Sequence, residues 1–196
     1  VEANSQLCGM RGDCTMHGDP DQLTYLAHGG LGVFTLGVTD SHFHESRREG
    51  RLLRLLLDTH ARFGFGVDEA TALKAEFSSD DDVRLQVMGK GGVWIVDARD
   101  AIVSTNNGEW TATGFRASRL LAGDSARWLG GELDVALDCG AGERSNHLLD
   151  AASEAFAADL GDGWSRVPGS APVAACRRAD GKWHYDQAPM RLTRRR

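Results

Sequence analysis

The chain has 196 residues, of which 41% are hydrophobic and 26% charged, with a formal net charge of -6 and a pI near 5.6. These values are typical of a globular protein of about one domain and exclude the disordered and fibrous classes. The acidic balance argues against a nucleic-acid binder, and no apolar run reaches the roughly 18 residues of a membrane helix, so we expect neither kind of partner.

The first half of the chain predicts strands around one helix. Residues 1–22 are rich in turn-forming glycines and predict loop with some helix, and the apolar run VFTLGVT at 33–39 predicts a buried strand. Arg48 to Phe63 places leucines on one face and charges on the other, which predicts an amphipathic helix. FGVDEATALKAEF then predicts a short strand, a polar corner at 68–71 and a further strand.

The second half of the chain predicts mostly strands. VRLQVM and VWIVDA are separated by GKGG and predict a β-hairpin, because glycines suit the tight turn. Residues 97–107 predict a polar connection, and WTATGFRASRLL resumes the alternation of a strand. Near the end, Asn146 to Leu160 has apolar residues at helical spacing, with Ser145 as its cap.

The four cysteines, Cys8, Cys14, Cys139 and Cys176, include no pair at CxxC spacing. Cys8 and Cys14 could close a small disulfide loop in an oxidising compartment, or remain thiols in a cytosol. The possible disulfide slightly favours an exported protein, and the cellular compartment stays open.

Several polar residues follow the first predicted strand. In open α/β sheets, ligands bind beyond the carboxyl ends of the strands, and DSHFH, from Asp40 to His44, occupies such an end. If the strand period continues, His42 and His44 point to one side and Phe43 to the other. We therefore expect the two histidines to be the first candidates for a catalytic or ligand-binding role at this strand end.

Two arginines follow on the predicted helix. Arg48 and Arg51 lie one turn apart, so both guanidinium groups can reach the same anion, and a carboxylate-bearing substrate would suit them. His44 and Ser46, between the strand and these arginines, complete the predicted substrate-binding set.

Three interpretations of this segment stay open from the residues alone. One histidine could act as general base for a serine nucleophile and be oriented by a carboxylate. Asp40, His42 and His44 could instead bind a divalent metal, as in metal-dependent amidohydrolases, although the two nearby arginines disfavour a cation. The third interpretation is a pair of surface histidines beside a solvated helix.

Three linked motifs resemble a known family. GLGVFTLGVTDSHFHESRREGRLLRLL, GFGVDEATAL and VMGKGGVWIVDA resemble, in the same order and spacing, the cyanophycinase-like serine peptidases, relatives of the α-aspartyl dipeptidases. The resemblance covers about residues 30–98. It implies an α/β fold: the C-terminal part of a doubly wound, flavodoxin- or glutamine-amidotransferase-like three-layer sandwich with a β-hairpin meander. We expect this domain part over 1–100 and an extension packed on it over 101–196.

The resemblance also implies roles for individual residues. His42 matches the catalytic general base of the family, and Arg48 and Arg51 match arginines that line its substrate site. Asp68 and Glu69 match the acidic pair of the family's IDE motif, for which we expect a structural role. No metal or organic cofactor is implied.

Two acidic positions compete for the role of orienting the histidine. Asp19, in HGDP, resembles the acidic residue upstream of GLG, and Asp21 is a close rival. The chain also departs from the family at Ser46, which stands where cyanophycinases have the first arginine after DxHF. Because of this difference, the substrate of this chain need not be the cyanophycin on which the family acts.

The nucleophile is the larger departure. The family places its serine in GTSAGA, some forty residues before the DxHF histidine, which falls at or just before Val1. No GxSxGA motif occurs in this chain, and Ser5, the nearest hydroxyl, lacks the flanking glycines of a sharp nucleophile turn. We therefore expect an upstream N-terminal polypeptide to supply the serine, with self-cleavage and a simple sequence boundary both open as the origin of Val1.

A partner also follows from the expected fold. Half of a doubly wound sheet would expose an unpaired strand edge, so we expect the upstream polypeptide to complete the sheet and the completed unit to form a homo-oligomer. The predicted function is a subunit of a serine hydrolase that cleaves amide bonds next to aspartyl or isoaspartyl groups. The alternatives are an inactive binding or scaffold module and the metal-dependent amidohydrolase.

Overall fold

The structure is a computed structural model that describes residues 31–46, 48–106, 109–140, 143–145, 164–166 and 175–193. The elements in this part of the chain are β1 (Val38–Ser41), α2 (Glu49–Thr59), β2 (Phe63–Val67), β3 (Thr71–Ser79), β4 (Asp82–Gly89), β5 (Gly92–Asp97), β6 (Ile102–Asn106), β7 (Glu109–Leu121), β8 (Ser125–Leu129), β9 (Glu132–Ala136), β10 (Glu143–Ser145), β11 (Trp164–Arg166), β12 (Ala175–Arg177) and β13 (Trp183–Thr193).

The described strands form two sheets. The larger has the order β1-β2-β5-β7-β13-β12-β10, with β6 also paired to β7 and β11 to β13, and the smaller has the order β3-β4-β8-β9. Strands β1 and β2 run parallel, whereas β2–β5 and β5–β7 are antiparallel. The mixed α/β class predicted from the sequence is therefore confirmed, while the doubly wound order and its completion by another polypeptide stay predictions.

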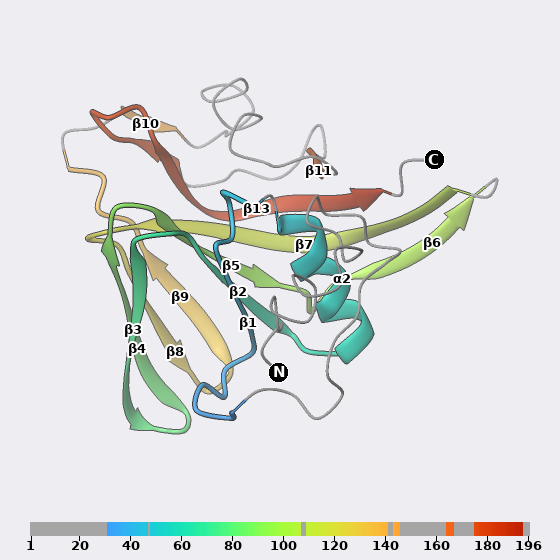
Figure 1. The fold of residues 1–196 in the computed structure, drawn as a ribbon, viewed down its shortest axis with the longest axis horizontal. Helices are drawn as coiled ribbons and strands as arrows, with labels where there is room; N and C mark the ends of the chain where they lie inside the picture. The colour runs from blue at the N-terminus through green and yellow to red at the C-terminus, as the bar shows by residue number, and fades with distance from the viewer. Residues whose placement is uncertain are drawn as a thin grey trace.

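Helix α2 and the smaller sheet cover the two faces of the larger sheet (Figure 1). Strand β5 shows why: Trp94 and Val96 pack in one core cluster with the leucines of α2, and Val93 and Ile95 pack in the other with β4 and β8. Successive residues of a strand point to opposite faces, so a continuous apolar run is what a doubly covered strand requires. The result is three layers.

The β1–α2–β2 unit positions the candidate site. Leu52, Leu53 and Leu56 are buried against the sheet, which matches the apolar stripe read from the sequence. Gly64 in β2 makes this close approach possible, because a Cβ there would lie 2.9 Å from Cδ1 of Leu52. The helix ends where His60 adopts a left-handed conformation with φ of 54°.

The predicted hairpin of VRLQVM and VWIVDA is wrong. Both segments are strands, β4 and β5, but β4 pairs with β3 and β8 in the small sheet, and β5 pairs with β2 and β7 in the large one. The GKGG segment therefore carries the chain from one sheet to the other. The apolar residues of β4 and of β5 pack against each other across the space between the two sheets. The apolar pattern of each strand is therefore explained by face-to-face packing of the sheets and not by pairing in a hairpin. The small sheet instead contains two hairpins, β3–β4 and β8–β9, and the chain passes through β5, β6 and β7 of the large sheet between them.

Other boundaries differ from the predictions by a few residues. The first strand is 38–41 instead of 33–39, and the predicted connection at 97–107 contains β6. The polar corner at 68–71 and the strand over WTATGFRASRLL are confirmed as the β2–β3 turn and β7. The predictions for 1–22 and 146–160 lie outside the described residues.

A disulfide joins Cys139, which follows β9, to Cys176 in β12, with their Cα atoms 5.5 Å apart. The spacing of the cysteines in the sequence suggests only Cys8 and Cys14 as a pair, and these lie outside the described residues. Among the described residues, no helix has the length and apolar character needed to cross a bilayer.

Candidate active site

The imidazole of His42 and the carboxylate of Glu69 meet at one edge of the large sheet. Because β1 and β2 are parallel, with Ser41 opposite Val67, the residues that follow their carboxyl ends are neighbours. His42 Nδ1 lies 2.7 Å from Glu69 Oε1, and the two side chains are 61% and 55% exposed. Within the described part of the chain, Glu69 is the one hydrogen-bond partner of this imidazole.

The backbone at His42 has an uncommon conformation. Its φ is 48°, in the left-handed region that few non-glycine residues occupy and that occurs repeatedly at active sites. The Ser46 amide donates to the His42 carbonyl at 3.3 Å, and the Phe43 amide donates to the Val67 carbonyl at 3.2 Å. These bonds hold the turn over the end of β2.

Glu69 lies on a corner fixed by hydrogen bonds. The Asp68 carboxylate accepts from the amides of His44 at 3.1 Å and Gly92 at 2.8 Å, and burial raises the pKa of Asp68. The Glu69 amide donates to Glu45 Oε1 at 3.0 Å, so the loop that contains His42 also holds the backbone of its carboxylate partner. The structural role expected for the acidic pair is seen at Asp68, whereas Glu69 faces His42.

The two predicted substrate arginines do reach the same anion, and that anion is Asp40. Arg51 donates to both Asp40 oxygens, with Nε 2.9 Å from Oδ2, and both side chains are almost completely buried. Arg48 Nη1 lies 3.6 Å from Asp40 Oδ1 and 2.5 Å from the Ser41 carbonyl oxygen. Burial raises the pKa of Asp40, and the Arg51 charge opposes that change. The pair fixes the end of β1 to the first turn of α2.

His44 occupies a different place from His42. The strand ends at Ser41, so the alternation expected over 42–44 does not continue. His44 Nδ1 lies 3.0 Å from Oε1 of the buried Glu49, and its ring stacks on Trp94 at a centroid distance of 6.2 Å and an angle of 19°. Burial raises the pKa of Glu49. The two histidine rings therefore have separate carboxylate partners.

The metal alternative at Asp40, His42 and His44 finds no support in this geometry. The Asp40 oxygens face Arg51, and the two imidazoles face Glu69 and Glu49. The described residues bring together three potential metal ligands at another place, Cys139, Cys176 and His184.

Asp19, Asp21 and Ser5 lie outside the described residues, so their predicted roles stay predictions. Ser46 lies in the turn after His42 and is half-buried. Glu69 is the site residue for which the sequence analysis expected only a structural role. A signal for it was present: in a strand–helix–strand unit with parallel strands, the residues after the first and second strand lie side by side.

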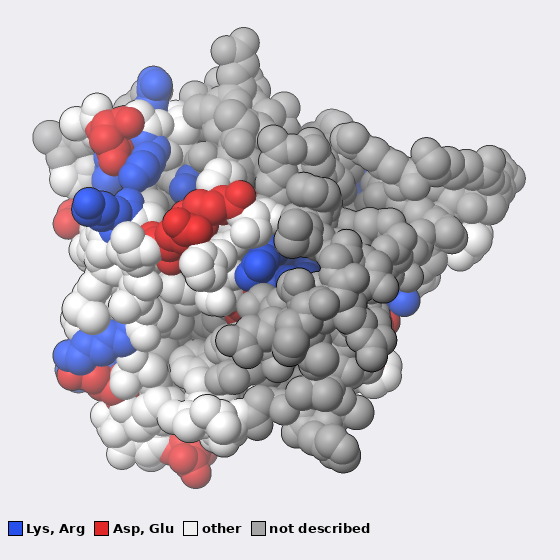
Figure 2. All heavy atoms as spheres, viewed as in Figure 1, with Lys and Arg blue, Asp and Glu red and all other residues white. Residues whose placement is uncertain are grey.

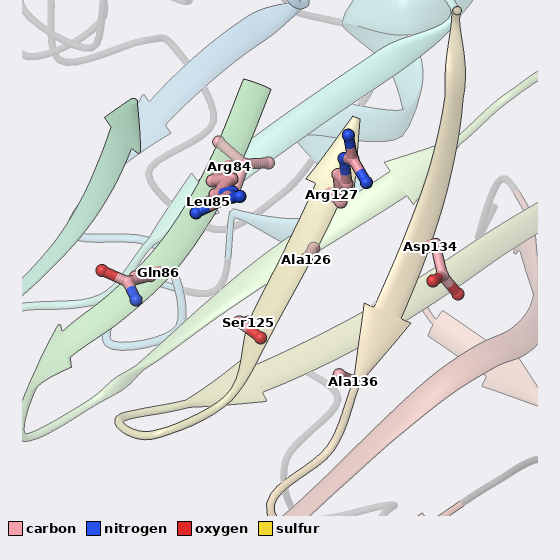
Figure 3. Close-up of a pocket in the computed structure, with 8 residues that line it drawn as sticks. All are labelled: Arg84, Leu85, Gln86, Ser125, Ala126, Arg127, Asp134 and Ala136. Atoms are coloured by element: carbon pink, nitrogen blue, oxygen red, sulfur yellow. The ribbon is translucent and has the colours of Figure 1, made fainter. Parts of the chain in front are cut away.

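One face of the molecule shows charges of both signs. Acidic and basic side chains of the described residues are interspersed over the face shown in Figure 2. A hollow of about 230 Å³ lies elsewhere, on strands β4, β8 and β9 of the small sheet, where Arg84 and Gln86 lie across from Ser125 and Arg127 (Figure 3). None of the predicted site residues lines it.

Comparison with known proteins finds similarity over part of the chain. No protein-family model matches the chain. A cyanophycinase from Geminocystis herdmanii is 41% identical over 83 residues, 42% of this chain and 29% of that protein. Another from Trichormus variabilis is 44% identical over 68 residues, 35% of this chain and 22% of that protein. Over part of its length, this chain is similar to the cyanophycinases.

The resemblance drawn from the three motifs is thus confirmed for the cyanophycinase-like chain. A third cyanophycinase, from Thermosynechococcus vestitus, is 39% identical over 71 residues, 36% of this chain and 21% of that protein. The matched segment spans less than a third of each of these relatives.

Proposed function

We propose that this cyanophycinase-like chain supplies the histidine and the orienting carboxylate of a serine hydrolase active site. The observation that carries the proposal is the 2.7 Å contact between His42 Nδ1 and Glu69 Oε1. A carboxylate on Nδ1 keeps the proton on that nitrogen and leaves Nε2 free to accept one, which is the arrangement a serine general base requires. Glu69 therefore takes the orienting role that the sequence analysis gave to Asp19.

The proposed reaction uses a serine on the upstream polypeptide. His42 Nε2 accepts the serine hydroxyl proton while the serine oxygen bonds to the amide carbon. His42 then gives that proton to the amide nitrogen as the carbon–nitrogen bond breaks, and water releases the acyl group by the same two proton transfers. The Glu69 carboxylate stabilises the imidazolium that forms during both acylation of the serine and release of the acyl group.

The substrate class rests on the relatives and on one arginine. The relatives are named cyanophycinases, and we propose amide bonds next to aspartyl or isoaspartyl groups as the substrate of this chain. Because Arg51 is paired with the buried Asp40, we assign it a positioning role. Arg48, with a side chain 15% exposed, is the better candidate for contact with a substrate carboxylate.

The upstream partner has a place to bind in the proposed assembly. Strand β1 lies at the end of the large sheet, and among the described residues it pairs only with β2. A strand of the upstream polypeptide beside β1 would complete the sheet and bring its serine to the edge where His42 lies.

The decisive experiment is active-site labelling of the assembly of this chain with its upstream polypeptide. A fluorophosphonate should label one serine of that polypeptide, and His42→Ala should abolish the labelling. His60→Asn is the matched control, because His60 is exposed and also left-handed, a conformation that Asn tolerates. Absence of label in the unmodified assembly would favour the inactive scaffold instead.

A further inference from the structure

A second group of chemically reactive side chains lies away from the His42 edge. His184 in β13 and Asp124, in the turn between β7 and β8, are both fully buried, and His184 Nδ1 lies 2.7 Å from Asp124 Oδ2. Cys176 is the direct cross-strand neighbour of His184, and Cys139 is bonded to Cys176. Four segments of the chain thus converge on one small region.

The free nitrogen of His184 is the unexplained feature of this group. His184 Nε2 is buried and has no hydrogen-bond partner in the described part of the chain. A buried polar atom without a partner is costly, and a bound ion or water is one of the explanations for such an atom in a native structure. The two sulfurs and a ring nitrogen of His184 lie within 4.8 Å of one another.

These groups match the ligand chemistry of zinc. Thiolate and imidazole are the preferred ligands of structural zinc, at about 2.3 Å for sulfur and about 2.0–2.1 Å for nitrogen. A metal-bound histidine usually donates its other N–H to a carboxylate, which fixes the ring and its tautomer. Asp124 is suited to that role, because its own oxygens accept the amides of Leu121 and Asp138, each at 2.7 Å.

We propose that Cys139, Cys176 and His184 bind a zinc-class divalent cation when the two cysteines are reduced, with Asp124 orienting the imidazole. Reduction of the disulfide by a dithiol adds two electrons and two protons and gives two thiols, while the dithiol becomes a disulfide. The cation then displaces the two thiol protons and bonds to both sulfurs and to His184 Nε2. A water completes the four ligands.

The site would join the segment that follows the last strand of the small sheet to two C-terminal strands of the large sheet. Cys139 follows β9, Cys176 lies in β12 and His184 in β13, so one ion joins three segments that the disulfide joins only in part. Metal binding to such a site adds directly to the free energy of folding. The bound cation and the disulfide are therefore alternative cross-links that use the same two cysteines.

The test uses Co²⁺ as a spectroscopic probe on the full chain reduced with a dithiol. We expect one Co²⁺ per chain with a thiolate-to-cobalt charge-transfer band, displaced by one equivalent of Zn²⁺ and absent from the oxidised chain. Cys176→Ser should abolish the band, whereas Cys8→Ser with Cys14→Ser should leave it. Asp124→Asn should weaken Zn²⁺ binding about 10- to 100-fold by loss of the orienting carboxylate.

Two results would overturn the proposal. One is a reduced, folded chain that shows no charge-transfer band, which would make the pair a disulfide only. The other is a band that survives Cys176→Ser or is lost with Cys8 and Cys14. Circular dichroism of each variant, and the comparison of oxidised with reduced unmodified chain, separate these results from a failure to fold.

Discussion

The ring of Phe43 lies directly on the backbone of Gly66. A Cβ built on Gly66 would be only 2.4 Å from two atoms of the Phe43 ring, so no side chain fits there. Phe43 is fully buried, and it follows His42 in the turn at the end of β1. The turn that contains His42 and Phe43 can therefore lie this close to the sheet because residue 66 of the neighbouring strand β2 has no side chain.

Gly66→Ala should damage both stability and the active site. The added methyl must push Phe43 outward, and we expect a loss of about 1–3 kcal/mol in the free energy of unfolding, as for other overpacked cores. His42 moves with Phe43, so phosphonate labelling should slow as well. Urea unfolding and the labelling rate measure the two effects.

The combination with Phe43→Leu tests the cause. A smaller side chain at 43 gives the methyl room, so the double variant should be more stable than the sum of the two single changes predicts. Strict additivity of the two unfolding free energies would contradict the proposed contact.

Glu69→Gln should slow labelling of the assembly by up to about 10⁴-fold, the loss seen when the orienting carboxylate of a Ser-His-Asp triad is replaced by its amide. Glutamine keeps the size of the side chain but does not hold the proton on His42 Nδ1 or stabilise the imidazolium. Glu76→Gln is the matched control, since Glu76 is also exposed and is paired with Lys74 instead of a histidine. Equal labelling rates for the two variants would remove Glu69 from the mechanism.

Much of this site could be predicted from the sequence, and the exceptions have physical reasons. His42 was recognisable because DSHF follows an apolar strand and precedes an amphipathic helix. The contact between Glu69 and His42 was not predicted, because a sequence shows spacing along the chain, whereas this contact depends on β1 and β2 being parallel and in register. The alternation rule failed at His44 because a left-handed residue ended the strand.

The arginines and the predicted hairpin also show that sequence spacing alone does not identify contacts between distant parts of the chain. Helical spacing correctly brought Arg48 and Arg51 to one anion, but spacing alone could not identify that anion as the buried Asp40. Glycines correctly marked the turn between β4 and β5, but the partner of each strand was set by the core it covers. Local patterns predicted the elements, and long-range packing decided which groups meet.

Arg51→Met should destabilise the chain by about 3–5 kcal/mol, because it removes the guanidinium that donates to both oxygens of the buried Asp40 carboxylate and leaves only Arg48, at 3.6 Å. Adding Asp40→Asn removes that charge and should recover a large part of the loss. Urea unfolding measures both variants. Arg54→Met is the control: Arg54 pairs with Asp58 one turn along the same helix on a partly exposed face, and its loss should cost at most about 0.5 kcal/mol. A loss at Arg51 no larger than this would show that the buried pair contributes little.

Glu49→Gln should change how stability depends on pH. Burial raises the pKa of Glu49 above its ordinary 4.5, with the hydrogen bond from His44 opposing the change. Between pH 4.5 and the raised pKa, the folded chain therefore binds more protons than the unfolded chain. The stabilising contribution of this group is complete below pH 4.5 and is lost as the pH rises through the raised pKa.

The variant lacks this titration, so the unfolding free energy of the unmodified chain should fall relative to that of Glu49→Gln as the pH rises. Glu76→Gln supplies a control of opposite sign, because the hydrogen bond from Lys74 lowers the pKa of Glu76. Relative to that variant, the unmodified chain should gain stability as the pH rises through the lowered pKa. Urea unfolding of the three chains from about pH 4 to about pH 8 gives both differences. A constant difference for Glu49→Gln would mean that folding does not raise the pKa of Glu49. A difference with the sign of the Glu76 control would mean that His44 outweighs burial and lowers this pKa.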